Sequence, residues 1–227
     1  MGKKNLLNMM VSSGLIDEYK ITIPISSLKD HGIKTAVVDA SNYIHRYGPS
    51  NLCGGFIELN KTFNNHGCVL NFVFDGKPPK EKQIILEERK KRRNKNKTIV
   101  GKYEGKLMFF KEQLSLQTTT HNEKIEIKTQ MTEVTANIKK YKKRSFSIKK
   151  EHITVLKNLF DYLKIPYIHL HNYEADLVCS RLVGMKHADA CLSDDYDLIS
   201  YNCKCILRNL DMKNGTVDII KLDELYS

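Results

Sequence analysis

Three short apolar runs that each end in acidic residues constrain the fold of this chain more than any other feature. They are TAVVD at residues 35–39, LNFVFD at residues 70–75 and ACLSDDYD at residues 190–197. Short runs of this kind, rich in Val, Leu and Phe, are typical of strands that are buried in a parallel sheet. The sequence therefore predicts an α/β fold with a mainly parallel central sheet flanked by helices.

The acids at the ends of these runs predict a shared site. Groups that follow the carboxyl ends of neighbouring parallel strands meet in one crevice. A single Asp after a strand is more often a helix N-cap or a turn residue. Two single Asp residues together with two acidic pairs spaced i,i+2 are hard to explain as separate caps. The acids are Asp39, Asp75, Glu174, Asp176, Asp195 and Asp197.

Six carboxylates in one place would repel one another unless a cation lies between them. Hard divalent cations such as Mg²⁺ prefer oxygen ligands. In two-metal phosphoryl-transfer sites the ions lie about 3.5–4 Å apart; they generate a nucleophile from water and stabilise charge on the phosphate. The acids therefore favour a two-metal site, and metal-assisted phosphodiester chemistry is the reaction that such a site suits.

The remaining patterns give an alternation of strands and helices. The predicted strands are residues 35–38, 69–74, 166–170, 189–192 and a final pair, 203–207 and 216–220, joined by a turn at Asn214-Gly215. The predicted helices are residues 1–10, 41–48, 56–64, 153–163 and 173–183. We expect an irregular segment between the first helix and Lys34.

A polar and very basic segment, about residues 80–150, interrupts this pattern. We predict one domain over residues 1–227, with this segment as a projecting insert that is helical near residues 87–97 and 131–144. The net charge of +11 and the pI of about 9.2 indicate an anionic partner, with nucleic acid as the leading candidate. The basic residues expected to contact it are Lys90, Lys91, Arg92, Arg93, Lys142, Lys143 and Arg144.

The cysteines and the apolar content give expectations about metals and location. None of the six cysteines forms a Cys-x-x-Cys pair, which argues against a zinc site. The sequence shows no secretory signal and no apolar stretch long enough to span a membrane. We therefore expect reduced thiols, no membrane partner and an intracellular location, either the nucleus or a cytoplasmic replication site of the viral type.

At these residues the chain resembles the flap endonuclease family of structure-specific 5′-nucleases, which have a PIN-like fold. The matching motifs are VVDAS at residues 37–41, FVFDGKPP at 72–79, IPY at 165–167, EAD at 174–176 and SDDYD at 193–197. The resemblance covers most of the chain and is weakest across residues 101–138. It implies a metal-dependent nuclease that cuts flapped or branched DNA, or degrades DNA from 5′ to 3′, in replication and repair.

The resemblance also implies roles for individual residues. Asp39, Asp75, Glu174 and Asp176 would hold one Mg²⁺, and Asp195 and Asp197 a second, with Asp176 shared and with Mn²⁺ able to replace Mg²⁺. Lys82 and Arg89 resemble the catalytic basic residues that contact the scissile phosphate at the base of a helical arch. The insert resembles the arch itself. His45 occupies the position of an aromatic residue that stacks on a terminal base.

Two departures from the family pattern leave alternatives open. Asp176 stands where eukaryotic members usually have a second Glu, and Asp194 falls where the pattern needs no acid. The sequence also stops where a helix–turn–helix region that grips duplex DNA would begin, so we expect that a protein partner supplies this grip. The alternatives are a nuclease that acts on RNA, and a nucleic-acid-binding protein of the same fold with reduced or lost catalysis.

Overall fold

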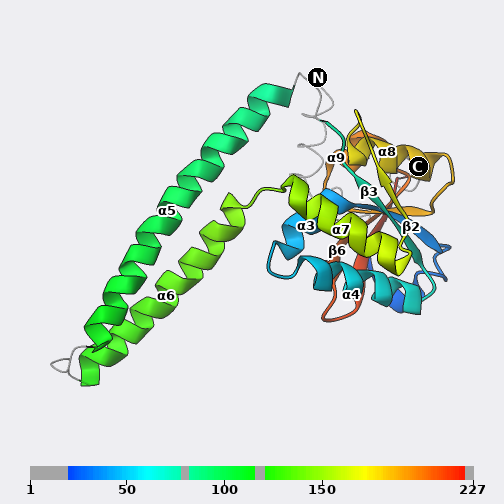
Figure 1. Ribbon diagram of the computed structural model, residues 1–227. Helices are drawn as coiled ribbons and strands as arrows, with labels where there is room; N and C mark the ends of the chain where they lie inside the picture. Colours follow the sequence, from blue (N-terminus) through cyan, green and yellow to red (C-terminus); the bar gives the residue numbers. More distant parts are fainter. Residues whose placement is uncertain (1–19, 78–81, 116–120, 223–227) are drawn as a thin grey trace. The chain divides into compact units, whose positions relative to one another are not determined.

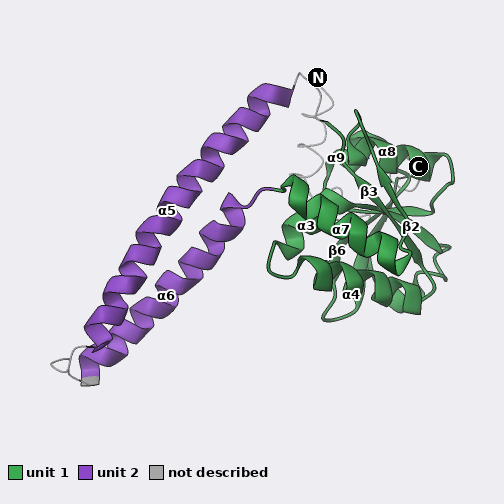
Figure 2. Cartoon of the chain, in the orientation of Figure 1, with its two compact units in different colours: residues 1–79, 148–227 green, residues 80–147 purple. Residues whose placement is uncertain are grey.

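The computed structural model describes residues 20–77, 82–115 and 121–222 (Figure 1). The chain forms two compact units, shown in different colours in Figure 2. The first unit contains residues 1–79 and 148–227, and the second contains residues 80–147. The predicted helix at residues 1–10 lies outside the described residues.

The first unit is built on a mixed sheet to which the described residues contribute seven strands. They are β1 (Lys20–Pro24), β2 (Thr35–Asp39), β3 (Val69–Phe74), β4 (Tyr167–His169), β5 (Ala190–Leu192), β6 (Cys205–Asp211) and β7 (Thr216–Lys221). The strand order is β1-β7-β6-β5-β2-β3-β4. The strands from β6 to β4 in this order are parallel, whereas β7 runs antiparallel to both β6 and β1. The predicted α/β fold with a mainly parallel sheet is confirmed.

The helices of this unit lie in the connections between the strands. They are α3 (Ala40–Tyr47), α4 (Leu52–Asn65), α7 (Lys150–Leu163), α8 (Ala175–Gly184) and the short α9 (Asp197–Ser200), together with the 3₁₀ turn η1 (Ile25–Ser27). The chain moves from β2 through β3 to β4 in one direction and then returns to β5 on the other side of β2. Right-handed crossovers therefore place α4 and α7 on one face of the sheet and α8 on the other (Figure 1).

Aromatic side chains fill the core between the sheet and the first helical layer. Phe72 of β3 lies with its ring centroid 4.7 Å from that of Phe160 in α7 and 5.3 Å from that of Phe56 in α4. All three side chains are fully buried. The packing fixes β3 against both helices, and so fixes the end of β3 where Asp75 follows.

One strand was not predicted from the sequence, because its apolar pattern is weak. Residues 20–24 were expected to be irregular, but they form β1 at the edge of the sheet. Of this strand only Ile23 is buried, and Ile21 is 53% exposed, so its sequence lacks the apolar run of a central strand. The predicted final hairpin is confirmed as β6 and β7.

The second unit is a pair of long helices, α5 (Gln83–Ser115) and α6 (His121–Ser145). Their small core consists of Val100, Val134 and Ile138, with Tyr103 and Tyr141 stacked beside it at a centroid distance of 5.9 Å. Helix was predicted near residues 87–97 and 131–144, and both helices are longer than these ranges. A narrow apolar strip is enough to pair two such helices, so the helical period is hard to detect between the charged residues.

No helix among the described residues is both long enough and apolar enough to cross a bilayer.

Candidate metal and nucleic-acid site

The site begins at Asp39, the last residue of β2. Its Oδ1 accepts hydrogen bonds from the backbone amides of Ser41 at 2.9 Å and Asn42 at 3.3 Å, and so caps helix α3. The side chain is nearly buried, at 7% exposure. Asp39 is therefore a helix cap, as a single Asp after a strand often is, but it also lies at the carboxyl edge of the central strand. Because β2 pairs with both β3 and β5, this edge is the point where the strand order reverses.

Asp75 directly follows β3 and is fixed to the next acidic segment. Its Oδ1 accepts a hydrogen bond of 2.7 Å from the backbone amide of Ala175, the residue between Glu174 and Asp176. The adjacent amide of Gly76 donates to the carbonyl oxygen of Tyr173 at 3.0 Å. These two bonds bring the end of β3 against the start of α8.

Gly76 is needed for this approach. A Cβ atom at this position would lie 2.6 Å from the carbonyl carbon of His171 and 2.8 Å from the amide nitrogen of Asn172. Contacts this short to backbone atoms would force the two segments apart. The glycine in the motif FVFDGKPP therefore has a structural reason that the sequence pattern alone did not supply.

The third acidic segment follows β5 and is organised by its own short hydrogen bonds. The hydroxyl of Ser193 accepts from the amide of Asp195 at 3.2 Å, and Oδ1 of Asp195 accepts from the amide of Asp197 at 2.9 Å. Asp197 is the first residue of α9. Both acidic side chains are exposed.

Electrostatic interactions connect all six predicted acids. Burial raises the pKa of Asp176 to about 7, and the carboxylates of the other acids add to this effect in the order Asp195, Asp75, Asp197 and Glu174. The pKa of Asp39 is raised well above its ordinary value by burial and then by Asp176 and Asp75. The structure thus brings together side chains from four separate segments of the chain.

One of the acids, Asp176, offers an oxygen of the kind that a bound cation uses. Oδ1 of Asp176 is buried and, in the described part of the chain, has no hydrogen-bond partner. A buried acceptor of this kind beside other carboxylates is what a divalent cation requires. Within the described ranges, however, no three His, Cys, Asp or Glu side chains lie close enough together to hold one ion between them. The acids lie near enough to raise one another's pKa values, but their oxygens do not converge on a single ion position.

Asp194 differs from its neighbour Asp195. Its Oδ2 lies 3.5 Å from Nη1 of Arg46, and its Oδ1 accepts from the amide of Asn209 at 2.9 Å. Its carbonyl oxygen accepts from the guanidinium of Arg208 at 2.7 Å. Asp194 therefore fixes the loop after β5 to α3 and β6.

Sequence reasoning missed Arg46 and Arg208, which support this loop. Arg208 is 5% exposed, and its guanidinium carbon lies 3.4 Å from the centroid of the Tyr196 ring. An arginine inside the apolar run of residues 205–210 was a visible signal, because a charged side chain is rarely buried without a partner. Its partners could not be identified before the fold was known.

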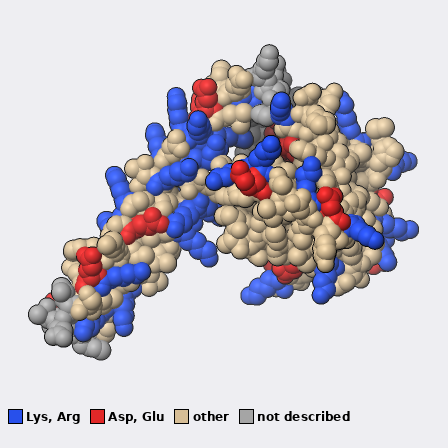
Figure 3. Space-filling view, viewed as in Figure 1, with Lys and Arg blue, Asp and Glu red and all other residues tan. Residues whose placement is uncertain are grey.

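The predicted nucleic-acid contacts lie on both units. His45 is exposed on α3, whereas Lys82 comes directly before α5. The other basic residues lie exposed or half-buried on the two long helices, where Lys and Arg side chains gather in Figure 3. They are Arg89, Lys90, Lys91, Arg92 and Arg93 on α5, and Lys142, Lys143 and Arg144 on α6. Lys142 also pairs with Glu104 across the helices at 2.7 Å. The contacts of these residues with a substrate stay predictions.

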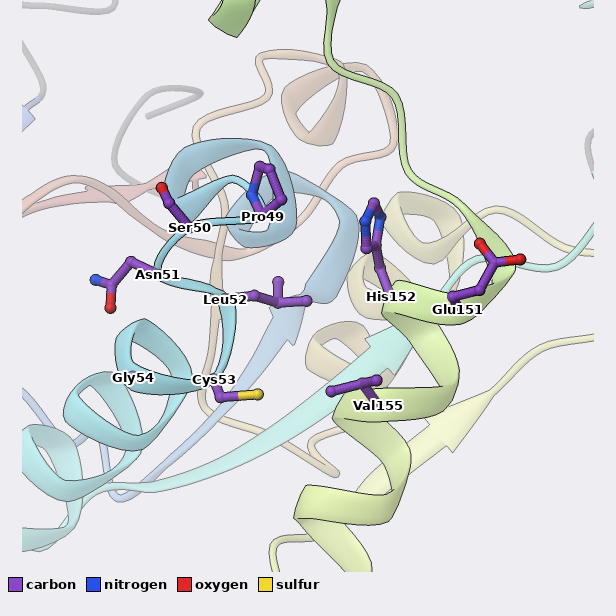
Figure 4. Close-up of a pocket in the computed structure, with 9 residues that line it drawn as sticks. All are labelled: Pro49, Ser50, Asn51, Leu52, Cys53, Gly54, Glu151, His152 and Val155. Carbon is purple, nitrogen blue, oxygen red and sulfur yellow. The ribbon is translucent and has the colours of Figure 1, made fainter.

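A cavity of about 410 Å³ lies between the first turns of α4 and α7. Figure 4 shows Leu52, Cys53 and Val155 pointing toward one another across it, with His152 at its rim. Both helices lead back to the amino ends of the next strands, so their first turns lie on the same side of the sheet as the acids. None of the nine lining residues is one of the six acids, so the cavity is separate from the metal site.

Comparisons with known proteins agree with this arrangement. Residues 164–227, which include α8 and the two acidic pairs, match the family described as the XPG I-region. Flap endonuclease 1-B of Xenopus laevis is 26% identical over 207 residues, which cover 82% of this chain and 47% of that protein. Flap endonuclease 1 of Nitrosopumilus maritimus is 25% identical over 220 residues, or 86% of this chain and 57% of that protein.

Solved structures share the fold. The catalytic core of Rad2 in complex with DNA substrate matches with a TM-score of 0.60 at 16% identity, covering 93% of this chain and 52% of that one. Flap endonuclease-1 from Methanococcus jannaschii matches with a TM-score of 0.53 at 22% identity, covering 91% and 61%. The chain spans about half the length of the curated relatives it matches. In its sequence the chain is similar to flap endonucleases and to the XPG I-region, and in its fold it is similar to solved structures of the same group of structure-specific 5′ nucleases.

Proposed function

We propose that this chain is a divalent-metal-dependent nuclease that hydrolyses phosphodiester bonds near the 5′ ends of flapped or branched DNA, by endonucleolytic or 5′-to-3′ exonucleolytic cleavage. The proposal is supported most by the electrostatic influence of six acids from four chain segments on one another, together with the buried Oδ1 of Asp176. A fold that only had to bind phosphates would gain nothing from such a cluster, because carboxylates repel a phosphate backbone.

The acids have distinct parts in this proposal. Asp39, Asp75, Glu174 and Asp176 would hold one Mg²⁺, and Asp195 and Asp197 a second, with Asp176 shared. When bound, the two ions would stabilise the charge that develops on the phosphate and would lower the pKa of a water molecule. Backbone amides already orient Asp39, Asp75 and Asp195, so little side-chain freedom remains to be lost when the site is used.

The basic helices would bind the substrate. Lysine and arginine neutralise backbone phosphates without regard to sequence, and Lys82 and Arg89 would act on the phosphate that is cut. His45 would stack on a terminal base. Two solved relatives support the choice of substrate: Rad2 is in complex with DNA substrate, and human GEN1 is in complex with Holliday junction DNA. A GEN1 structure in complex with product DNA and an Mg²⁺ ion supports the choice of metal.

Cleavage of a labelled 5′-flap DNA by the purified chain tests the proposal. We expect products with Mg²⁺ or Mn²⁺ and none with EDTA. The Asp75→Asn variant should bind the flap but cut it at least about a hundredfold more slowly. Asp30→Asn, a change at an exposed acid before β2, is the matched control and should cut at the wild-type rate.

Two other outcomes would contradict the proposal. Tight flap binding without cleavage under either metal would favour a binding protein that has lost catalysis. Faster cleavage of a matched RNA flap than of the DNA flap would make the chain an RNA-directed nuclease.

A further inference from the structure

A second cavity lies at the opposite edge of the sheet from the acids. It has a volume of about 480 Å³ and is formed where β2, β5 and β6 begin and where β7 ends. Its floor is apolar, because Ile33, Val183 and Ala188 line it and are each at most 5% exposed. We call this space, lined by those residues and by the basic residues named next, the amino-edge cavity. Its volume is in the range of small-ligand sites.

The sides of the amino-edge cavity are strongly basic. His31, Lys186, Lys204 and Lys221 line it, with Asp189 as the one acid among its lining residues. Oδ2 of Asp189 accepts hydrogen bonds from the backbone amides of Lys34 at 2.9 Å and Thr35 at 2.8 Å. Part of the negative charge in the cavity is therefore already engaged by the backbone. Three lysines that line one concave surface favour an anion with several acceptor oxygens.

The lysines stand on well-fixed backbone. Lys221 pairs with Cys205 in the ladder of β6 and β7, and the carbonyl oxygen of Lys204 accepts from the amide of Leu222 at 3.0 Å. Lys186 ends the turn after α8, where its amide donates to the carbonyl oxygen of Val183 at 3.0 Å. The three come from separate segments, so the concentration of charge is not the result of one basic run in the sequence.

We infer that the amino-edge cavity binds a phosphorylated nucleoside unit, with the base against the apolar floor and the phosphate among the lysines. A phosphate alone would make no use of the apolar floor, and an uncharged nucleoside would make no ionic contact with the lysines. The unit could come from a free mononucleotide or from one nucleotide of a single strand. The site lies at the far end of the strands from the acids, so the inference does not depend on the proposed cleavage.

Titration calorimetry on the full chain tests this inference. The Asp75→Asn variant in EDTA is used, so that no substrate is consumed and the cleavage site is inactive. The ligands are a nucleoside 5′-monophosphate, the nucleoside, inorganic phosphate, a short single-stranded DNA and a hexamer of glutamate. We expect the monophosphate, the single strand or both to bind, and the other three ligands to bind at least about tenfold more weakly.

Charge reversal locates the binding. Adding Lys186→Glu or Lys204→Glu should weaken nucleotide binding roughly tenfold or more, whereas Lys186→Arg should preserve it. Lys61→Glu, on the exposed side of α4, is the matched control and should leave it unchanged. Equal affinity with and without Lys186→Glu would overturn the inference. Equally tight binding of phosphate alone would also overturn it, because the apolar floor would then contribute nothing to binding. Equally tight binding of the glutamate hexamer would overturn it as well, because it would indicate an acidic protein partner.

Discussion

The carboxylate of Asp75 accepts a hydrogen bond of 2.7 Å from the backbone amide of Ala175, and this contact joins the two halves of the candidate metal site. Asp75 ends the segment of β3, and Ala175 is the residue between Glu174 and Asp176. The bond therefore sets the position of three acids with one contact. The parts of the sequence that the long helical pair separates are brought together at this point.

Gly76→Ala should damage the site although it removes no acid. The new Cβ would lie 2.6 Å from the carbonyl carbon of His171, so the backbone must move and carry Asp75 away from Ala175. We expect a loss of about 1–3 kcal/mol in the free energy of unfolding. We also expect flap cleavage to slow roughly tenfold or more. Chemical denaturation and single-turnover cleavage measure the two effects.

Gly105→Ala is the control for this change. Gly105 lies inside α5, and a Cβ there would meet no atom within 4 Å. Alanine should stabilise the helix by about 0.5–1 kcal/mol. If Gly76→Ala has the same harmless effect, the close approach of the two segments is not essential.

Asp176→Asn should stabilise the chain at high pH when EDTA is present. The pKa of Asp176 is raised from 3.8 to about 7 by burial first and by neighbouring carboxylates next. A raised pKa means that the folded state holds the proton more tightly than the unfolded state does. Stability from this group is thus fully present below pH 3.8 and is lost as the pH rises through 7.

Asparagine cannot ionise, so the Asp176→Asn variant does not lose stability as the pH rises. At pH 8 the variant should exceed the wild type in free energy of unfolding by up to about 4 kcal/mol, and near pH 4 the difference should largely vanish. Asp30→Asn should change stability by less than about 0.5 kcal/mol. A gain for Asp176→Asn that does not depend on pH would show that Asp176 is not destabilised by its charge. Urea denaturation at several pH values gives the comparison.

Asp194 and Asp195 are adjacent, but substitutions at the two positions should have different effects on stability and cleavage. Asp194→Ala removes one of the partners of Arg46 and the partner of the Asn209 amide, so we expect a loss of about 1–2 kcal/mol in stability. Asp195→Asn keeps the acceptor oxygen for Asp197 and removes only charge, so stability should hold while cleavage falls at least about a hundredfold. Thermal unfolding and cleavage rates, measured on both variants, separate the roles. The reverse pattern would exchange the roles assigned to the two acids.

Ile138→Asp should open the helical pair without affecting the sheet. Ile138 is 8% exposed and packs with Val100 and Val134 in the small core between α5 and α6. Burying an unpaired carboxylate there should cost about 2–3 kcal/mol of local stability and weaken flap binding. Thr135→Asp, on the exposed side of α6, adds the same charge and should change protection little. Hydrogen exchange followed by residue would show increased exchange in α5 and α6 only, and equal exchange in both variants would argue against the core.

The central strands could be predicted from sequence because burial gives them a strong pattern. Residues 69–74 form β3 with the expected bounds, since each end is marked by a polar turn and every residue between them except Asn71 is apolar. The edge strand β1 has one buried side chain and gave no such pattern. The length of α5 could not be predicted either, because among its residues only Val100 is buried and the apolar pattern is therefore weak.

The acids of the candidate site could be predicted from the sequence, but the contacts that hold them in place could not. Acids at strand ends are visible in sequence because topology brings strand ends together. The bond between Asp75 and Ala175, the need for glycine at position 76 and the pairing of Arg46 with Asp194 depend on tertiary contacts between distant segments. The roles of Lys82, Arg89 and His45 toward a substrate stay predictions.

Anomalous diffraction from crystals soaked in Mn²⁺ tests the central claim most directly. The account predicts two manganese peaks at the carboxyl edge of the sheet, one beside Asp39, Asp75 and Glu174 and one beside Asp195 and Asp197, with Asp176 between them. Both peaks should weaken in Asp176→Asn crystals that diffract equally well. If the wild type shows no peak among these carboxylates at high manganese concentration, the two-metal site does not exist and the proposed cleavage mechanism is wrong.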